Sequence, residues 1–129
     1  MANDTQQWLT GAVVRGSGRG KGLGFPTANI RLSAGSVRPA DGVYACWVKV
    51  GSEAQLYRGA LHSGPRPTYG DAQPTVEVHL INFPARDLYG QDLSFCCVAR
   101  LRDVHNFASA DQLRNAIERD CQMAINALV

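Results

Sequence analysis

The segment Thr75–Asn82, TVEVHLIN, has the two-residue periodicity that decides the fold class. One face of this segment carries Val76, Val78 and Leu80, and the other carries Glu77, His79 and Ile81. Such alternation predicts a β-strand, because successive side chains of an extended chain point to opposite faces. On the pattern alone, Glu77 is more often a solvent-facing carboxylate than a functional group.

Four further segments on either side of this one are predicted to be strands: Trp8–Arg15, Val43–Val50, Gln55–His62 and Leu93–Asp103. Most of them end at turns rich in Gly, Pro or Asp. No helix separates the strands, so neighbouring strands should pair in antiparallel fashion. Five or six such strands in a chain of 129 residues favour a small, closed or nearly closed barrel, which leaves no exposed sheet edge.

One helix is predicted after the strands, from the N-cap Ser109 to about Leu128. Gln112, three residues after the cap, completes a capping-box pattern. The residues that form an apolar stripe at helical spacing are Leu113, Ala116, Ile117, Cys121, Ala124 and Leu128. We expect this stripe to pack on the barrel, with an oligomer seam as the alternative.

The composition is that of a single globular domain covering residues 1–129, with a core from about residue 8 to 128. Apolar residues make up 45% of the chain and the net charge is +2, which does not favour a nucleic-acid-binding or membrane protein. We expect a cytoplasmic location because the N-terminus is polar and lacks a signal-peptide pattern. The four cysteines form no C-x-x-C pair and are interpreted as buried free thiols.

A glycine-rich stretch, RGSGRGKGLGFPTANI, occupies residues 15–30 and places glycine at every second position from Gly16 to Gly24. It matches neither the Walker spacing nor the dinucleotide-binding G-x-G-x-x-G spacing. Backbone amides together with Arg19 and Lys21 would form a concave site for phosphate oxygens. A plain surface loop is the alternative interpretation.

Pro26 stiffens the end of this stretch and favours an extended backbone around it. Thr27 and Asn29 are two residues apart, so their side chains would point the same way. Two neutral oxygen ligands beside phosphates suit Mg²⁺, which takes few protein ligands when it is bound to a nucleotide. A Thr and an Asn that cap a turn are the simpler alternative.

These residues, taken in order, resemble the riboflavin kinase (flavokinase) module. The resemblance extends from about Gly11 to Leu128, and the matching pieces are residues 16–30 with PTAN, Gly42-Val43-Tyr44, Arg66-Pro67-Thr68, residues 76–80, residues 87–90, Leu101-Arg102 and Phe107. It implies a six-stranded antiparallel Greek-key β-barrel with a C-terminal α-helix. It also implies transfer of the γ-phosphate of ATP to the 5′-hydroxyl of riboflavin, with FMN and ADP as products.

The resemblance implies a role for each site residue. Glu77 would be the catalytic base, and Thr27 and Asn29 would hold Mg²⁺ and phosphates. The nucleotide contacts would be Gly16, Gly18, Lys21, Thr27, Asn29 and Asn82, and the flavin contacts Arg102, Phe107 and Asp87. We expect a monomer with no nucleic-acid or membrane partner.

The chain also departs from the family pattern. Lys21 and Gly22 stand where the family often has Arg and a polar residue. The H-x-G-H signature of the adenylyltransferase domain is missing, since the nearest string is His62-Ser63-Gly64-Pro65, so we expect no FAD synthesis from this polypeptide.

Two other functions remain open at this point: a flavin or nucleotide carrier without turnover, and a small-barrel protein that binds single-stranded nucleic acid through Arg15, Arg19 and Lys21. His62 and His105 have no Cys or acidic partner at metal-ligand spacing. His79 shares the face of Glu77, but a histidine in a strand more often packs or binds water, so all three are interpreted as structural.

Overall fold

A computed structural model describes residues 7–14, 27–66, 71–84 and 86–129 of the chain. Within these ranges the elements are β1 (Trp8–Val14), β2 (Thr27–Leu32), β3 (Gly42–Val50), β4 (Leu56–Arg66), β5 (Asp71–Ile81), β6 (Asp92–Arg102) and α1 (Ala110–Ala127). The five strands predicted from the alternation are present. Strand β2 was anticipated only as an extended segment, because the glycines and the proline before it hide the strand signal.

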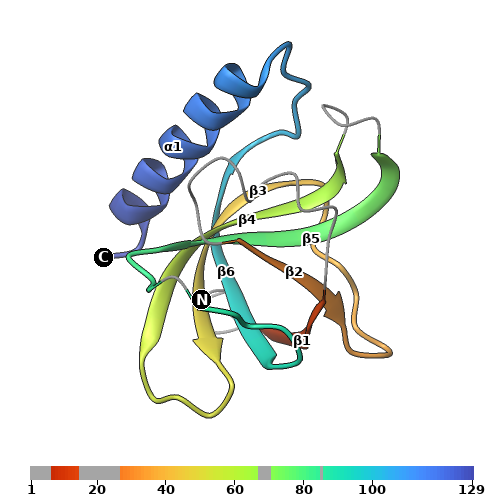
Figure 1. The fold of residues 1–129 in the computed structure, drawn as a ribbon, viewed down its shortest axis with the longest axis vertical. Coiled ribbons are helices and arrows are strands. Elements are labelled where there is room, and N and C mark those ends of the chain that lie inside the picture. The colour runs from red at the N-terminus through yellow and green to blue at the C-terminus, as the bar shows by residue number, and fades with distance from the viewer. Residues whose placement is uncertain (1–6, 15–26, 67–70, 85) are drawn as a thin grey trace.

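The strands close into a barrel in the order β1-β2-β5-β4-β3-β6, and every pairing is antiparallel (Figure 1). Strands β3, β4 and β5 follow one another as a meander, and β6 then returns to pair with β3. This order is that of a Greek key. Strand β6 also pairs with β1, which closes the barrel.

The interior of the barrel is apolar. From β5 it receives Val76, Val78 and Leu80, as the alternation predicts, and they pack with residues such as Leu61 and Phe95 from other strands. These side chains leave no room for another at Gly59, where an added Cβ would lie 2.8 Å from Cγ2 of Val78. The tight interior makes the barrel a rigid frame for the groups on its outer face.

Helix α1 covers part of the outer face of the barrel and forms a second apolar cluster there (Figure 1). The six residues of the predicted stripe are all buried. The backbone N–H of Gln112 donates to Oγ of Ser109 at 3.2 Å, and Oε1 of Gln112 accepts from the N–H of Ala108 at 3.0 Å. The predicted cap and stripe are therefore confirmed, and the stripe is covered by the chain's own barrel.

The four cysteines are free. Burial raises the pKa of Cys97 to about 12 and that of Cys121 to about 11, and it raises the pKa of Cys46 as well. Thiols with such pKa values are weak nucleophiles at neutral pH. Among the helices of the described residues, none is long and apolar enough to cross a membrane.

Candidate active site

A single row of residues crosses five strands on the outer face of the barrel. Asn29 on β2 is paired with Glu77 on β5, and Glu77 is paired with His62 on β4. The row continues through Val43 on β3 to Arg102 on β6. Residues far apart in the sequence thus become neighbours because of the strand register.

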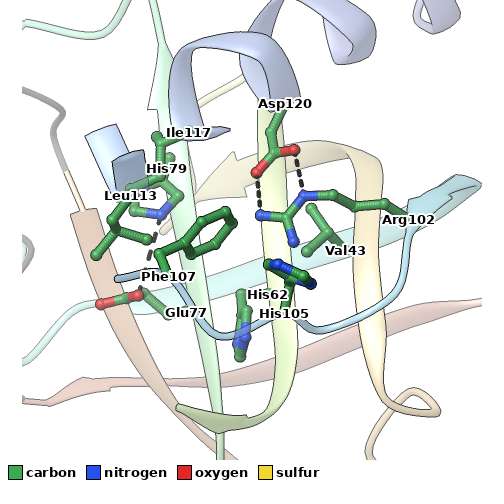
Figure 2. Close-up of a pocket in the computed structure, with 10 residues that line it drawn as sticks. All are labelled: Val43, His62, Glu77, His79, Arg102, His105, Phe107, Leu113, Ile117 and Asp120. Atoms are coloured by element: carbon green, nitrogen blue, oxygen red, sulfur yellow. Dashed lines mark hydrogen bonds and ion pairs between the residues drawn. The ribbon is translucent and has the colours of Figure 1, made fainter. Parts of the chain in front are cut away.

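Thr27 and His79 form the adjacent pair of the same face. Oγ1 of Thr27 and Nδ1 of His79 lie 3.0 Å apart, at hydrogen-bond distance. Nε2 of the same imidazole is 4.0 Å from Oε1 of Glu77 (Figure 2). Glu77 and His79 are only 3% and 5% exposed, so this carboxylate is not the solvent-facing group that the alternation alone favoured.

Helix α1 and the segment between β6 and α1 cover the part of this row that runs from Glu77 to Arg102. A small, partly open pocket beneath them is lined by Val43, His62, Glu77, His79, Arg102, His105, Phe107, Leu113, Ile117 and Asp120 (Figure 2). Its volume is about 30 Å³, which is room for one or two water molecules. A larger ligand therefore needs the covering side chains to move.

An ion pair between the partly buried Arg102 and the buried Asp120 links α1 to the barrel. Nε and Nη2 of Arg102 donate to the two carboxylate oxygens of Asp120 on α1, each at 2.7 Å (Figure 2). Nη1 of Arg102 donates to the carbonyl of Asp103 at 3.0 Å, and its guanidinium lies 5.5 Å from the ring centre of Phe107. Arg102 therefore holds both the helix and the connecting segment.

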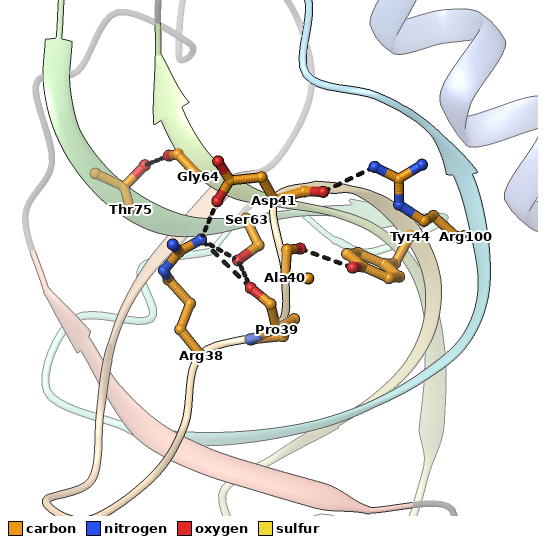
Figure 3. A network of polar contacts seen from close by, with 9 residues as sticks. All are labelled: Arg38, Pro39, Ala40, Asp41, Tyr44, Ser63, Gly64, Thr75 and Arg100. Atoms are coloured by element: carbon orange, nitrogen blue, oxygen red, sulfur yellow. Dashed lines mark hydrogen bonds and ion pairs between the residues drawn. The ribbon is translucent and has the colours of Figure 1, made fainter.

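The floor of the pocket is braced from the other side of β4. Nη1 of Arg38 donates to Oγ of Ser63 at 2.9 Å and pairs with Oδ1 of Asp41 at 2.9 Å (Figure 3). Oγ of Ser63 donates to the carbonyl of Pro39 at 2.7 Å. Because Ser63 follows His62, this network fixes the strand directly beside the pocket.

Comparison with known proteins identifies the family. A family model described as flavokinase, riboflavin kinase, matches residues 4–128. The chain belongs to the riboflavin kinase family.

Individual relatives support the same family assignment. Riboflavin kinase of Mus musculus is 38% identical over 118 residues, which cover 88% of this chain and 76% of the mouse protein. The bifunctional riboflavin kinase/FMN adenylyltransferase of Haemophilus influenzae is 39% identical over 118 residues, 90% of this chain. The match spans only 37% of that longer protein.

A solved structure of the family has the same fold. The crystal structure of riboflavin kinase from Trypanosoma brucei superposes with a TM-score of 0.69 at 27% identity, covering 94% of this chain and 78% of that one. The six-stranded barrel with one C-terminal helix is therefore the riboflavin kinase architecture.

The other residues that the resemblance selected lie outside the pocket or outside the described structure. Asn82 is exposed at the end of β5 with a φ of +54°, a left-handed conformation that Asn tolerates better than most residues. Asp87 is exposed, and its Oδ1 accepts from the N–H of Tyr89 at 2.9 Å. Gly16, Gly18 and Lys21 fall in residues 15–26, outside the described part of the chain.

The residues of β2 fit a nucleotide-bound Mg²⁺. Thr27 and Asn29 lie on one face, each partly exposed, and their side chains are neutral oxygen donors beside the buried carboxylate of Glu77. Among the described residues, no group of three or more His, Cys, Asp or Glu side chains gathers to hold a metal by itself. This donor set suits a cation whose other ligands are phosphate oxygens and water.

Sequence reasoning missed Asp120. Its signal was present, because a carboxylate three residues after Ile117 and directly before Cys121 falls on the apolar face of a helix. A charged group is rarely buried without a partner, so this position required a cation from another element. The partner is Arg102 on β6, and the sequence could not identify it because the pairing depends on how α1 packs on β6.

Proposed function

We propose that the chain transfers the γ-phosphate of ATP to the 5′-hydroxyl of riboflavin. In this reaction a bond forms between the ribityl oxygen and the γ-phosphorus, and the bond from that phosphorus to the β,γ-bridging oxygen breaks. The hydroxyl proton passes to a base of the protein, and the products are FMN and ADP. Membership of the riboflavin kinase family supports the proposal, and the position of Glu77 carries it.

Glu77 is the proposed base. Its carboxylate is buried, on the face of β5 that carries His79, and it is paired across the sheet with Asn29. A carboxylate held in this way orients the primary alcohol and accepts its proton as the bond to phosphorus forms. Of the three glutamates in the sequence, Glu53 and Glu118 are neither in this pocket nor in a strand.

The proposed nucleotide side of the site is β2 with the glycine-rich stretch before it. Thr27 and Asn29 would hold Mg²⁺ together with the phosphates, and Gly16, Gly18, Lys21 and Asn82 would contact the nucleotide. When bound, Mg²⁺ would neutralise charge on the transferring phosphoryl group. The strand register supports this assignment, because it pairs Asn29 with Glu77, the proposed base, and Thr27 with His79.

The proposed flavin side is the covered end of the row. Phe107, Leu113 and Ile117 supply an apolar wall for a planar ring system, and Arg102 supplies hydrogen-bond donors beside it. Asp87 is a proposed flavin contact on resemblance alone. Because the pocket holds only one or two waters, a flavin would require side chains that line it to move.

The purified chain, incubated with riboflavin, ATP and Mg²⁺, tests the proposal directly. We expect a flavin product with the mass of FMN, formed in proportion to ADP, and no FAD. Omission of Mg²⁺ should stop the reaction. Riboflavin that binds but is recovered unchanged would instead indicate a carrier, and salt-sensitive oligonucleotide binding without either result would indicate a nucleic-acid binder. Light scattering of the same sample checks the proposed monomer.

A further inference from the structure

His79 lies between Thr27, the proposed ligand of Mg²⁺ and phosphates, and Glu77, the proposed base. Its Nδ1 is 3.0 Å from Oγ1 of Thr27, and its Nε2 is 4.0 Å from Oε1 of Glu77. The imidazole is buried, and it lines the pocket together with Glu77 (Figure 2). From the sequence, this histidine was interpreted as structural.

The sheet itself produces this arrangement. Thr27 is the cross-strand partner of His79, and Glu77 precedes His79 by two residues on the same face of β5. The two nitrogens of an imidazole point in different directions, so one ring contacts a neighbour across the sheet and another along the strand. A side chain with a single polar end cannot make both contacts.

The hydrogens of the Thr27 hydroxyl and the His79 ring can be assigned to one consistent arrangement. A threonine hydroxyl has one hydrogen and two lone pairs. If its oxygen is to face a cation, its hydrogen must point elsewhere, and Nδ1 of a neutral His79 accepts it. The ring proton then sits on Nε2 and faces the carboxylate of Glu77. An ionised carboxylate can accept hydrogen bonds but cannot donate one.

We propose that His79 is a positioning residue that couples the two halves of the site. Through Nδ1 it turns the oxygen lone pairs of Thr27 toward the metal-bound phosphates, and through Nε2 it orients the carboxylate of Glu77 toward the alcohol. This inference rests on the proposed function. The distance of 4.0 Å to Glu77 is electrostatic contact, and catalytic contacts of this kind commonly shorten when substrates bind.

Three substitutions separate the two contacts. In His79→Asn the terminal amide takes the place of Nδ1 and can still contact Thr27, whereas in His79→Gln it takes the place of Nε2 and can still contact Glu77. His79→Leu removes both contacts and keeps an apolar side chain in the buried position. Val78→Ala is the control, because it alters the neighbouring residue on the inner face of the same strand.

Two measurements are made on each variant: the affinity for Mg·ADP by calorimetry, and kcat with saturating riboflavin and Mg·ATP. Loss of a contact to a ligand-bearing side chain typically costs 10- to 100-fold. We therefore expect His79→Gln to lose at least tenfold in Mg·ADP affinity and His79→Asn to lose at least tenfold in kcat with nearly normal affinity. His79→Leu should lose both, and Val78→Ala neither.

The position of the proton on the His79 ring gives an independent readout, which is measured on the wild-type chain and needs no variant. In the Mg·ADP complex of the wild-type chain, imidazole ¹⁵N shifts should show His79 with its proton on Nε2. A proton on Nδ1 would overturn the inference. So would equal losses in the Asn, Gln and Leu variants, which would mean that His79 only fills space.

The outcome for the wild-type chain keeps this inference distinct from the proposed function. If the wild type binds Mg·ADP but forms no FMN, the proposed function fails, and with it the role of His79 toward Glu77. If the wild type forms FMN and His79→Leu matches it in both kcat and Mg·ADP affinity, only the inference about His79 fails.

Discussion

The two faces of β5 are both buried, but they differ in what covers them. The inner face is enclosed by the other strands of the barrel and carries Val76, Val78 and Leu80. The outer face carries Glu77 and His79 and is covered by α1 and by the segment that leads into it. A polar group can be buried where neighbouring side chains supply partners, as Thr27 does for His79, whereas the interior around Val76, Val78 and Leu80 is apolar.

On β5, the residues of the inner face therefore serve stability and those of the outer face serve the proposed chemistry. The inner face holds the barrel together through packing, and the outer face presents groups to a pocket beneath α1 and the segment before it. Alternation of period two therefore does more than mark a strand here, because it assigns consecutive residues to two different tasks. Substitutions on the two faces should consequently fail in different ways.

The largest effect should come from Glu77→Gln on the outer face. The amide keeps the size of the side chain but cannot accept the proton of the alcohol, so we expect kcat to fall by about 10²- to 10⁴-fold. Thermal unfolding should stay close to that of the wild type. Steady-state kinetics with riboflavin and ATP measure the effect, and near-normal turnover would remove Glu77 from the role of base.

The next effect concerns the fastening of the cover. Arg102→Ala leaves the carboxylate of Asp120, which is 2% exposed, without its guanidinium, and breaking such a pair costs about 3 to 5 kcal/mol. The measurement is unfolding in urea, supported by the KM for riboflavin, which should rise.

Asp120→Asn is the matched control for this ion pair. It should cost less than Arg102→Ala, because the Arg102 side chain is 24% exposed and reaches water once its partner is neutral. If the two variants were equally stable, the buried carboxylate would not be what makes the pair costly to break.

The inner face predicts the opposite pattern of losses. Leu80→Ala removes a side chain that is 2% exposed in the barrel core, and a cavity of this kind costs about 2 to 5 kcal/mol. Below its unfolding transition, however, the variant should keep its kcat, because Leu80 points away from the pocket. Denaturant unfolding and turnover at the same temperature test both halves. A large loss of kcat in folded protein would show that the two faces are not separate.

Much of this division could be predicted from the sequence, since it depends on local periodicity. The alternation of residues 76–81 assigned each side chain to the correct face, and Ser109 with Gln112 located the start of the helix. The apolar stripe of α1 was correct as well. These features depend on neighbours one to four residues away, which a single sequence displays directly.

The contacts that make the site were harder to predict because they depend on register. Thr27 meets His79 across 52 residues of sequence, and Arg102 meets Asp120 across a strand end and a helix. The burial of Glu77 also depends on where α1 rests, which no local pattern encodes. Local spacing singled out Thr27 and Asn29, and family resemblance added a role for Glu77, but neither gave a role to His79 or Asp120.

The smallest effect should come from Asn82, which lies at the end of β5 beyond both faces. Its φ of +54° is strained for most residues but not for glycine, so Asn82→Gly preserves the backbone while it removes the side chain. Asn82→Ala removes the same side chain and adds about 1 to 2 kcal/mol of backbone strain.

If the side chain contacts the nucleotide as proposed, both variants should raise the KM for ATP about three- to tenfold, in line with one lost hydrogen bond of about 0.5 to 1.5 kcal/mol. Only Asn82→Ala should unfold earlier on heating. A normal KM in Asn82→Gly would mean that the residue serves the turn after β5 alone, and that the functional groups of this strand are confined to its outer face.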